Sequence, residues 1–343
     1  MNLLLIQSQE HEKLPLAELK AVMDAENIEA NINQLTPGLT LLENLDLETF
    51  NHSYKRLTDR LAYTHEVHQL IETTTLENLE KSVLNIDWSE FIKNNFVVRV
   101  KRFNSDIDTV KYERNIGGYI LDNTPNIKVK LVGSDSYIRV VVFEDTVFLC
   151  VEKYKLNKKH FEDSKPHKRP FFHPGGMSPK LARCMVNLSR IKEGELLLDP
   201  FCGTGGMLIE AGLIGAKLVG SDINWKMKNG SALNLDFVGI KDYKTYKIDF
   251  KQLKMLEPAD VVVTDPPYGI STTTGGVSTT IILEEFLDSL EGNLKKDGLI
   301  VLATPHYIDI NPIMNEKGFK ILEHYEIKMH RSLTRIISVI IKI

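Results

Sequence analysis

The sequence predicts an α/β protein. Its C-terminal half is expected to be a doubly wound, mostly parallel sheet that ends in an antiparallel hairpin, with a smaller α+β region before it. From residue 196 onward, short apolar runs alternate with segments of helical spacing, which is the order of a parallel sheet with helices on both faces. Phe319–Lys328 and Arg335–Ile343 are long alternating runs joined by a short polar segment, and they predict the hairpin. Before residue 153, strand and helix patterns follow one another less regularly, as in α+β folds.

The N-terminal half begins with a strand, a helix and a second strand. Leu3–Ile6 is apolar, Leu14–Met23 places apolar residues at helical spacing, and Ile28–Ile32 alternates. Thr36-Pro37-Gly38 then interrupts the pattern. The remaining elements expected in this half are a helix at Val110–Leu121 and strands at Phe96–Val100, Val129–Leu131, Tyr137–Phe143 and Thr146–Val151.

Residues 153–176 differ in composition from the chain on either side. The stretch Lys153–Arg169 is strongly basic, whereas residues 1–52 are mostly acidic among their charged positions. Prolines and glycines interrupt the segment up to Gly176, so it predicts a basic linker. The formal net charge of −4 and the pI of about 6.2 do not by themselves indicate a nucleic-acid-binding protein.

The C-terminal half opens with a helix at Ser178–Ser189, where Ser178 is a suitable N-cap and Pro179 suits the first helical position. Strands and helices then alternate. The strands are expected at Leu196–Asp199, Leu218–Asp222, Tyr243–Asp249, Val261–Asp265 and Leu299–Ala303, and the helices at Met207–Leu213, Met227–Val238 and near Ile282–Leu294.

Length and composition exclude several classes of protein. The 343 residues suggest two or three domains at about 100–200 residues each, and 43% hydrophobic with 26% charged residues excludes a disordered or fibrous chain. Apolar runs stay well short of the ~18 residues that span a bilayer, and Met1–Ile6 lacks the basic start of a signal peptide, so no membrane partner is expected. The 3 cysteines form no CxxC pair, which favours a reducing cytoplasm and argues against a structural metal site.

The strongest functional signal is the segment from Leu196 to Gly206, where an apolar strand ends in Asp199 and turns through small residues. Ligands of open parallel sheets bind beyond the carboxyl ends of the strands. Glycines such as Gly203 and Gly205 let the backbone approach a ligand without a Cβ clash. The pattern Gly-x-Gly-Gly is neither the dinucleotide fingerprint nor a P-loop. A tight turn without a ligand is the alternative.

Two further acids follow the next strands. Asp222 ends the strand after Asp199 and is placed to accept both hydroxyls of a ribose. Asp249 ends the following strand, and Phe250 beside it offers an apolar wall for an adenine ring. Each acid alone is also consistent with a solvated strand end. Together at successive strand ends, they predict a nucleoside pocket.

Asp265-Pro266-Pro267-Tyr268 follows another buried strand. The prolines fix the backbone and have no N–H, so the carbonyl of Pro266 and the carboxylate of Asp265 offer two acceptors to one planar NH₂ group. Tyr268 supplies a face against which an extruded base can stack. This set suits methylation of an exocyclic amine, and a rigid turn without such a role is the alternative.

Asp199–Gly206 followed by Asp265–Tyr268 resembles the S-adenosylmethionine-dependent amino-methyltransferases, which have the Rossmann-like class I fold. The order of motifs after an RNA-binding half is similar to that of THUMP-domain tRNA methyltransferases, in particular the archaeal tRNA (guanine-10-N2)-dimethyltransferase family. The resemblance covers essentially the whole chain, with support from Arg56–His65, Met177–Arg183 and His330–Arg335. It implies a ferredoxin-like domain over residues 1–52, a THUMP RNA-binding domain over 53–152, the basic linker over 153–176 and a methyltransferase domain over 177–343.

The resemblance also implies a role for each motif residue. S-adenosylmethionine would be the cofactor. Its methionine part would lie along Asp199, Gly203 and Gly205, its ribose at Asp222, and its adenine at Asp249 and Phe250. Thr204 and Ile223 would be further cofactor-binding residues. Asp265 with Pro266 would hold the target amine, and Tyr268 would lie against guanine. Amino-methyltransferases of DNA bases often have Asn where this chain has Asp265, so an RNA guanine is favoured over adenine or cytosine in DNA.

Basic residues outside these motifs are candidates for contact with tRNA phosphates. They lie in the linker, at a predicted helix and at the hairpin turn: Lys158, Lys159, Arg169, Arg114, Arg331 and Arg335. At the hairpin turn, Arg331 or Arg335 could instead reach the guanine edge. An ordinary solvated surface is the alternative for each of them.

The expected function is therefore that of a cytoplasmic enzyme that methylates the exocyclic N2 of guanosine 10 in tRNA. The sequence leaves open whether one or two methyl groups are added. Some family members work with a small zinc-containing activator protein, so such a partner is a further expectation. The alternatives are a THUMP methyltransferase for another guanosine, at tRNA position 6 or in rRNA, and a non-catalytic RNA-binding module.

Overall fold

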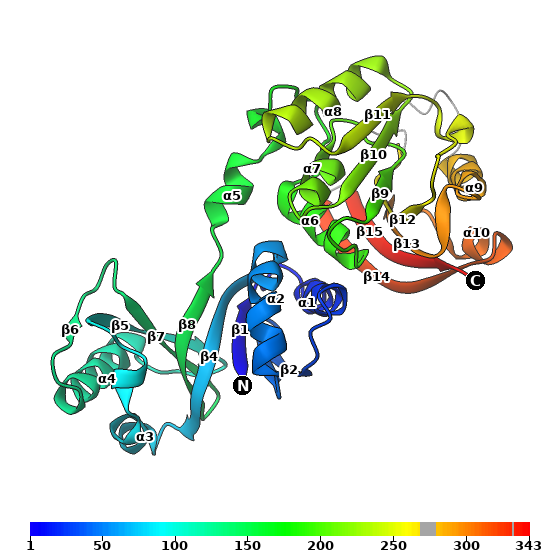
Figure 1. Ribbon diagram of the computed structural model, residues 1–343. Helices are drawn as coiled ribbons and strands as arrows, with labels where there is room; N and C mark the ends of the chain where they lie inside the picture. Colours follow the sequence, from blue (N-terminus) through cyan, green and yellow to red (C-terminus); the bar gives the residue numbers. More distant parts are fainter. Residues whose placement is uncertain (268–278, 331–332) are drawn as a thin grey trace. The chain divides into compact units, whose positions relative to one another are not determined.

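The computed structural model describes the backbone of residues 1–267, 279–330 and 333–343 (Figure 1). Tyr268 and Arg331, which both have predicted roles, lie outside the described residues. The chain forms two compact units. Unit 1 consists of Met1–Gln9, Glu29–His52 and Thr64–Leu156, and unit 2 of Glu10–Ile28, Ser53–Tyr63 and Asn157–Ile343.

Unit 1 is built on one eight-stranded sheet with the strand order β2-β3-β1-β4-β8-β7-β5-β6. β1 pairs antiparallel with both β3 and β4, so the sheet continues across the expected boundary between residues 52 and 53. β5 lies parallel to β6 and β7. The strands are β1 (Leu3–Gln7), β2 (Asn31–Thr36), β3 (Leu39–Glu43), β4 (Thr64–Thr75), β5 (Asn95–Phe103), β6 (Lys128–Val129), β7 (Ser136–Phe143) and β8 (Thr146–Lys155).

Two helices pack on the β5–β7–β8 part of this sheet, α3 (Leu79–Asn85) and α4 (Thr109–Asn123). Asp108 caps α4 by accepting a hydrogen bond from the N–H of Lys111 at 3.1 Å. Apolar residues of both helices share a buried cluster with Phe96 and with Trp88 of the short 3₁₀ turn η1 (Trp88–Glu90).

Unit 2 contains a seven-stranded sheet with the order β11-β10-β9-β12-β13-β15-β14. Neighbouring strands from β11 to β13 run parallel, and β15 is antiparallel to both β13 and β14. The doubly wound sheet with a terminal antiparallel hairpin is thus confirmed. The strands are β9 (Leu196–Asp199), β10 (Lys217–Asp222), β11 (Tyr243–Lys247), β12 (Ala259–Thr264), β13 (Leu294–Pro305), β14 (Phe319–His330) and β15 (Leu333–Lys342).

Helices cover both faces of this sheet (Figure 1). α6 (Pro179–Leu188), α7 (Gly206–Gly212) and α8 (Trp225–Phe237) lie on one face, and α9 (Thr279–Ser289) and α10 (Asn311–Glu316) on the other. The order of the strands reverses beside β9, because the chain passes from β9 to β10 on one side and later to β12 on the other. In such sheets the crevice at the carboxyl ends of these strands is the usual ligand site.

Segments from the N-terminal part of the chain belong to unit 2. They are α1 (Leu14–Ala25), which packs on α6, and the C-terminal end of α2 (Leu47–Arg60). The buried carboxylate of Glu18 accepts hydrogen bonds from the N–H groups of Ala62 and Tyr63 at 3.0 and 2.8 Å, and from Asn187 Nδ2 at 2.8 Å. This buried polar network fixes both N-terminal segments to α6.

The basic linker contains local structure that composition did not predict. α5 (Lys158–Asp163) is capped by Asn157, and a 3₁₀ turn, η2 (Pro166–Lys168), follows it. β8 also extends to Lys155, into the segment expected to be a linker. Within the part of the chain that the structure describes, each helix is too short or too polar to cross a bilayer.

Candidate active site

Asp199 occupies the centre of the candidate site. It ends β9 and is buried, and its Oδ1 accepts hydrogen bonds from Thr264 Oγ1 at 2.7 Å and from the Phe201 N–H at 3.2 Å. Burial raises the pKa of the Asp199 carboxyl to about 7, and the nearby carboxylates of Asp265 and Asp222 add to the increase. A cation bound here would stabilise the ionised form of Asp199.

The turn after Asp199 depends on glycine. Gly203 and Gly205 have φ angles of +50° and +81°, which favour glycine over other residues. A Cβ atom at Gly205 would also lie 2.6 Å from Ser231 Oγ. The carbonyl of Thr204 between them accepts a hydrogen bond from Asn234 Nδ2 at 2.9 Å. The loop is therefore held close to α8 and leads into α7. Its glycines have no side chains that would block the approach of a ligand.

Asp222 lies beside this loop, as the sequence predicted. It ends β10, the neighbour of β9, and its Oδ2 accepts a hydrogen bond from the Gly203 N–H at 3.1 Å. Its Oδ1 accepts from the Asn224 N–H at 2.8 Å, and burial raises the pKa of this half-buried carboxyl. Ile223, next in the chain, is exposed. The structure thus brings Asp199, Gly203 and Asp222 together at one edge of the sheet.

Asp249 and Phe250 follow β11 at the same edge. Asp249 caps the 3₁₀ turn η3 (Phe250–Gln252) by accepting a hydrogen bond from the Lys251 N–H at 3.0 Å. The ring of Phe250 lies 4.7 Å from the ring of Phe201, centroid to centroid. Both residues are half-buried. Their role in a nucleoside pocket stays a prediction.

Asp265 follows β12, which lies on the other side of β9. Its Oδ2 lies 2.8 Å from Nη2 of Arg335, a buried residue of β15. Pro266 is buried next to it. From the sequence, Arg335 was expected at RNA phosphate or at the guanine edge. Its contact with Asp265 was not expected, because the two residues are far apart in the chain. The predicted hairpin was the available signal for this contact, because its second strand, β15, pairs with β13 and places Arg335 opposite Pro305.

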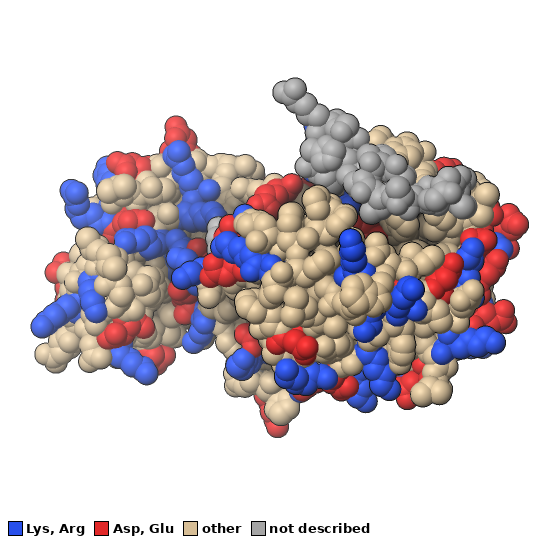
Figure 2. Space-filling model, turned by 90° about the horizontal axis from the view of Figure 1, so that it is seen from above, with Lys and Arg blue, Asp and Glu red and all other residues tan. Residues whose placement is uncertain are grey.

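Among the other candidate RNA contacts, Lys159 and Arg114 are exposed. The side chain of Lys158 is not among those described. Arg169 is buried: its Nε donates to the Ser164 carbonyl at 3.0 Å, and its Nη1 lies 3.8 Å from the position of a Cβ atom on Gly206. Figure 2 shows Lys and Arg mixed with Asp and Glu over the face that it draws, so charge alone does not outline an RNA path there.

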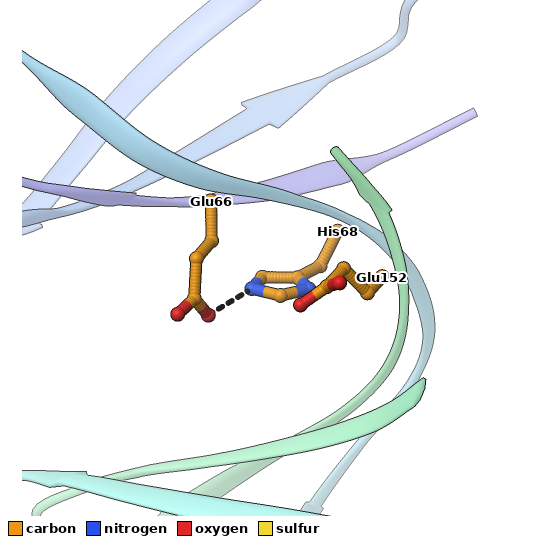
Figure 3. A group of neighbouring side chains, drawn as sticks. All are labelled: Glu66, His68 and Glu152. Carbon is orange, nitrogen blue, oxygen red and sulfur yellow. Dashed lines mark hydrogen bonds and ion pairs between the residues drawn. The ribbon is translucent and has the colours of Figure 1, made fainter. Parts of the chain in front are cut away.

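A second polar cluster lies in unit 1, on β4 and β8 (Figure 3). His68 is fully buried, its Nε2 lies 3.0 Å from Glu66 Oε2, and Glu152 lies near the other ring nitrogen. Arg139 Nη2 lies 2.6 Å from the same oxygen of Glu66. His68 and Arg139 together hold the pKa of Glu66 at about 2 despite its partial burial. Because Arg139 already neutralises Glu66, we interpret this cluster as a structural ion-pair network.

Comparison with known proteins identifies the family of the chain. The family model "RMKL-like, methyltransferase domain" matches residues 166–337, and the THUMP domain model matches residues 73–152. A tRNA (guanine(10)-N2)-dimethyltransferase of Methanothermobacter thermautotrophicus is 43% identical over 340 residues, covering 99% of both chains. The chain belongs to the tRNA (guanine(10)-N2)-dimethyltransferase family. Another member, from Methanocaldococcus jannaschii, is 37% identical over 366 residues, covering 97% of this chain and 98% of its own.

Solved structures agree on the fold of this family member. TrmN from Thermus thermophilus has a TM-score of 0.60 at 18% identity, with 100% of both chains covered. A putative methyltransferase, SMU.472, complexed with SAH, has a TM-score of 0.55 at 16% identity, covering 100% of this chain and 98% of its own. The expected architecture, a class I methyltransferase fold together with a THUMP domain, is confirmed.

Proposed function

We propose that this chain transfers methyl groups from S-adenosylmethionine to the exocyclic N2 of guanosine 10 in tRNA. The observation that carries the proposal is the convergence of Asp199, the Gly203–Gly205 turn, Asp222 and Asp265 at one sheet edge, in a chain that is similar over its full length to named guanine-10 enzymes.

The residues at this edge fit the cofactor. When bound, S-adenosylmethionine supplies an electrophilic methyl group on a positively charged sulphur. The Gly203–Gly205 turn leaves room for the methionine part, and Asp199 supplies negative charge near it. Asp222 is placed to accept the ribose hydroxyls, while Asp249 and Phe250 are placed to contact the adenine. Thr204 and Ile223 flank these positions.

The chain's own contribution to the reaction is to position the amine. The target guanine has to leave its stack before N2 can reach the site. We assign to Asp265, with the carbonyl of Pro266, the role of accepting hydrogen bonds from the N2 amine, and to Tyr268 that of stacking on the base. The amine lone pair is then aligned with the methyl group, and the Asp265 carboxylate stabilises the positive charge that develops on nitrogen.

The same site is suited to two successive transfers. The first transfer replaces one N2 proton, which leaves to solvent, so N2 keeps one N–H from which the Asp265 carboxylate can still accept a hydrogen bond. The relatives with full-length similarity are named dimethyltransferases. We therefore propose dimethylation, with a monomethylated intermediate that accumulates early in the reaction.

The N-terminal half is proposed to bind tRNA. The THUMP match at residues 73–152 supports this role, and exposed Arg114 lies within it as a candidate for phosphate contact. Exposed Lys159 is a further candidate in the linker. We also propose the domain boundaries that the resemblance implies, at residues 1–52, 53–152, 153–176 and 177–343. A small zinc-containing activator protein is a further proposed partner, and the cytoplasm is the proposed location because tRNA is modified there.

Methylation of an unmodified tRNA transcript with labelled S-adenosylmethionine, followed by nucleoside analysis and position mapping, tests the function. We expect N2-methylated guanosine at position 10 and none in a transcript with adenosine there. Asp265→Ala should lose turnover but keep cofactor binding, measured by calorimetry. Methylation at position 6 would instead favour the activity named for a 24% identical relative, a tRNA (guanine(6)-N2)-methyltransferase. Failure of the wild-type chain to bind the cofactor would favour a non-catalytic RNA-binding module.

A further inference from the structure

A buried arginine reaches the candidate active site from β15, outside the Asp199–Gly206 and Asp265–Tyr268 motifs. Arg335 lies on β15, opposite Pro305 at the end of β13. Because β15 is antiparallel to β13, its first residues lie at the edge where the parallel strands end. There Nη2 of Arg335 lies 2.8 Å from Asp265 Oδ2, and the two side chains are only 9% and 19% exposed.

The charge balance of the site explains why this contact matters. Asp265 lies close enough to Asp199 to raise its pKa, so the two acids disfavour each other's ionised form. A guanidinium keeps its charge at all relevant pH values. Its contact with Asp265 offsets the repulsion and fixes one orientation of the carboxylate. Asp265 then acts purely as an acceptor, whereas a protonated acid or an amide would present a donor as well.

An acceptor-only group matches one base edge in particular. Guanine has two adjacent donors on its Watson–Crick edge, N1–H and the N2 amine, whereas adenine places the acceptor N1 beside its N6 amine. We propose that Arg335 is a positioning residue that pairs with the Asp265 carboxylate and holds it in one orientation, so that the carboxylate accepts hydrogen bonds from both N1–H and N2–H and the site selects guanine. This inference rests on the proposed function.

Base analogues at position 10 test the selection directly. 2-Aminopurine keeps the N2 amine but has an acceptor at N1. We expect the wild-type chain to methylate guanosine at least about 100-fold faster than 2-aminopurine, because the analogue sets N1 against the carboxylate. In Arg335→Gln, kcat on guanosine should fall about 10- to 100-fold, while kcat on 2-aminopurine should fall much less. The ratio of the two rates, which is the guanosine preference, should therefore decrease. The KM for tRNA should change little.

Two further variants distinguish positioning from other roles. Arg335→Lys keeps the charge but not the planar fork, so it should recover part of the guanosine preference. Arg190→Gln is the matched control: it breaks ion pairs with Asp24 and Glu323 elsewhere in unit 2 and should leave the preference unchanged. Melting temperatures of all variants show whether each is folded, and if Arg335→Gln is not, Arg335→Lys supplies the comparison.

The outcomes distinguish a positioning role of Arg335 from an RNA contact and from a role in folding. A higher KM for tRNA with unchanged kcat would mean that Arg335 contacts RNA phosphate and would overturn the inference. Equal losses on guanosine and 2-aminopurine would mean that the arginine only stabilises the fold, which would also overturn it. If the wild-type chain methylates neither base at position 10, the proposed function itself fails. Loss of the guanosine preference in a folded Arg335→Gln variant would support the inference.

Discussion

Among the individual residues, Asp199 has the feature with the clearest consequence for binding. Burial raises the pKa of its carboxyl from 3.8 to about 7. Between roughly pH 4 and pH 7 the folded chain therefore keeps a proton that the unfolded chain has released. The contribution of Asp199 to the free energy of unfolding is largest below this window and falls as the pH rises through it.

Cofactor binding should show the opposite trend with pH. A sulfonium cation near Asp199 favours the carboxylate, so the affinity for S-adenosylmethionine should increase about tenfold from pH 6 to pH 8, as expected when only the ionised form binds well. Calorimetry at pH 6, 7 and 8 measures this. Asp199→Asn cannot titrate and should show a much flatter profile. Equal wild-type dissociation constants at pH 6 and pH 8 would contradict the assignment.

Gly205 allows a second prediction about a single residue. An alanine there would have both the unfavourable φ of +81° and a Cβ atom 2.6 Å from Ser231 Oγ. Gly239 has nearly the same φ, +82°, but its Cβ position has nothing within 4 Å. We expect Gly205→Ala to lower the free energy of unfolding by about 2–4 kcal/mol, and Gly239→Ala by about 1 kcal/mol. Urea denaturation measures the free energy of unfolding of both variants. Similar decreases would mean that Ser231 moves away from the new Cβ atom without destabilising the fold.

The motif residues themselves were predictable because each one ends a strand. Asp199, Asp222 and Asp265 follow apolar runs, and the carboxyl ends of neighbouring parallel strands meet at one edge. The hydrogen bond from Gly203 to Asp222 bears out that juxtaposition. Contacts that depend on distant chain segments, such as Arg335 with Asp265 or Ser231 with Gly205, have no comparable local pattern and emerged only from the fold.

At the scale of elements, the alternating β and α pattern gave most of unit 2. The hairpin is the clearest case: β14 and β15 pair antiparallel where two alternating runs predicted it. The expected helix near Ile282–Leu294 is less accurate, because α9 ends at Ser289 and β13 begins at Leu294. Leu294 suits either element by its hydrophobicity, and pairing with Ala259 on β12 places it in the sheet.

Four helices and strands of the N-terminal half were not predicted individually: β3, α2, β4 and α3. Leu47, Phe50, Tyr54 and Leu57 lie at helical spacing, so the sequence did contain a signal for α2. β4 is harder to recognise because its second half, up to Thr75, is polar and only partly buried. Its pairing with β1 and β8 compensates for the weak pattern.

The attachment of α1 to α6 gives a prediction at this scale. Removing the carboxylate in Glu18→Ala would leave the N–H groups of Ala62 and Tyr63 unpaired in a buried place and would remove one of the two acceptors of Asn187 Nδ2. We expect the free energy of unfolding to fall by about 2–4 kcal/mol. Glu12→Ala, at an exposed position before the same helix, should change it by less than about 0.5 kcal/mol. Urea denaturation followed by circular dichroism measures both, and equal effects would mean that the network contributes little.

For the whole molecule, the main feature is that neither unit is one continuous stretch of chain. Unit 2 uses Glu10–Ile28 and Ser53–Tyr63 together with Asn157–Ile343. The sequence pattern predicted a change of fold near residues 153–176 and placed the methyltransferase half after it. It did not predict that earlier helices cover this half, since local periodicity shows that a helix has an apolar face but not which surface covers it.

This arrangement predicts that the C-terminal half is weakened when it is isolated. A fragment of residues 157–343 lacks the Asp59 carbonyl, to which Arg183 Nη1 donates at 3.0 Å. It also lacks Glu18 and Arg60, the partners of Asn187. Arg183 is in turn paired at 3.0 Å with Glu210 of α7, the helix that begins at the cofactor loop. Loss of residues 10–28 and 53–63 should therefore destabilise the fold and weaken cofactor binding.

We expect the fragment to melt about 10 °C or more below the full chain, as for a loss of several kcal/mol in a domain of this size. The affinity of the fragment for S-adenosylmethionine should also be lower than that of the full chain. A version that joins residues 10–28 and 53–63 to 157–343 through flexible linkers restores α1 and the C-terminal end of α2 without unit 1, and it should recover most of the melting temperature. Scanning calorimetry and cofactor titration compare the three chains. An isolated fragment as stable as the full chain would show that the methyltransferase half folds independently of α1 and α2.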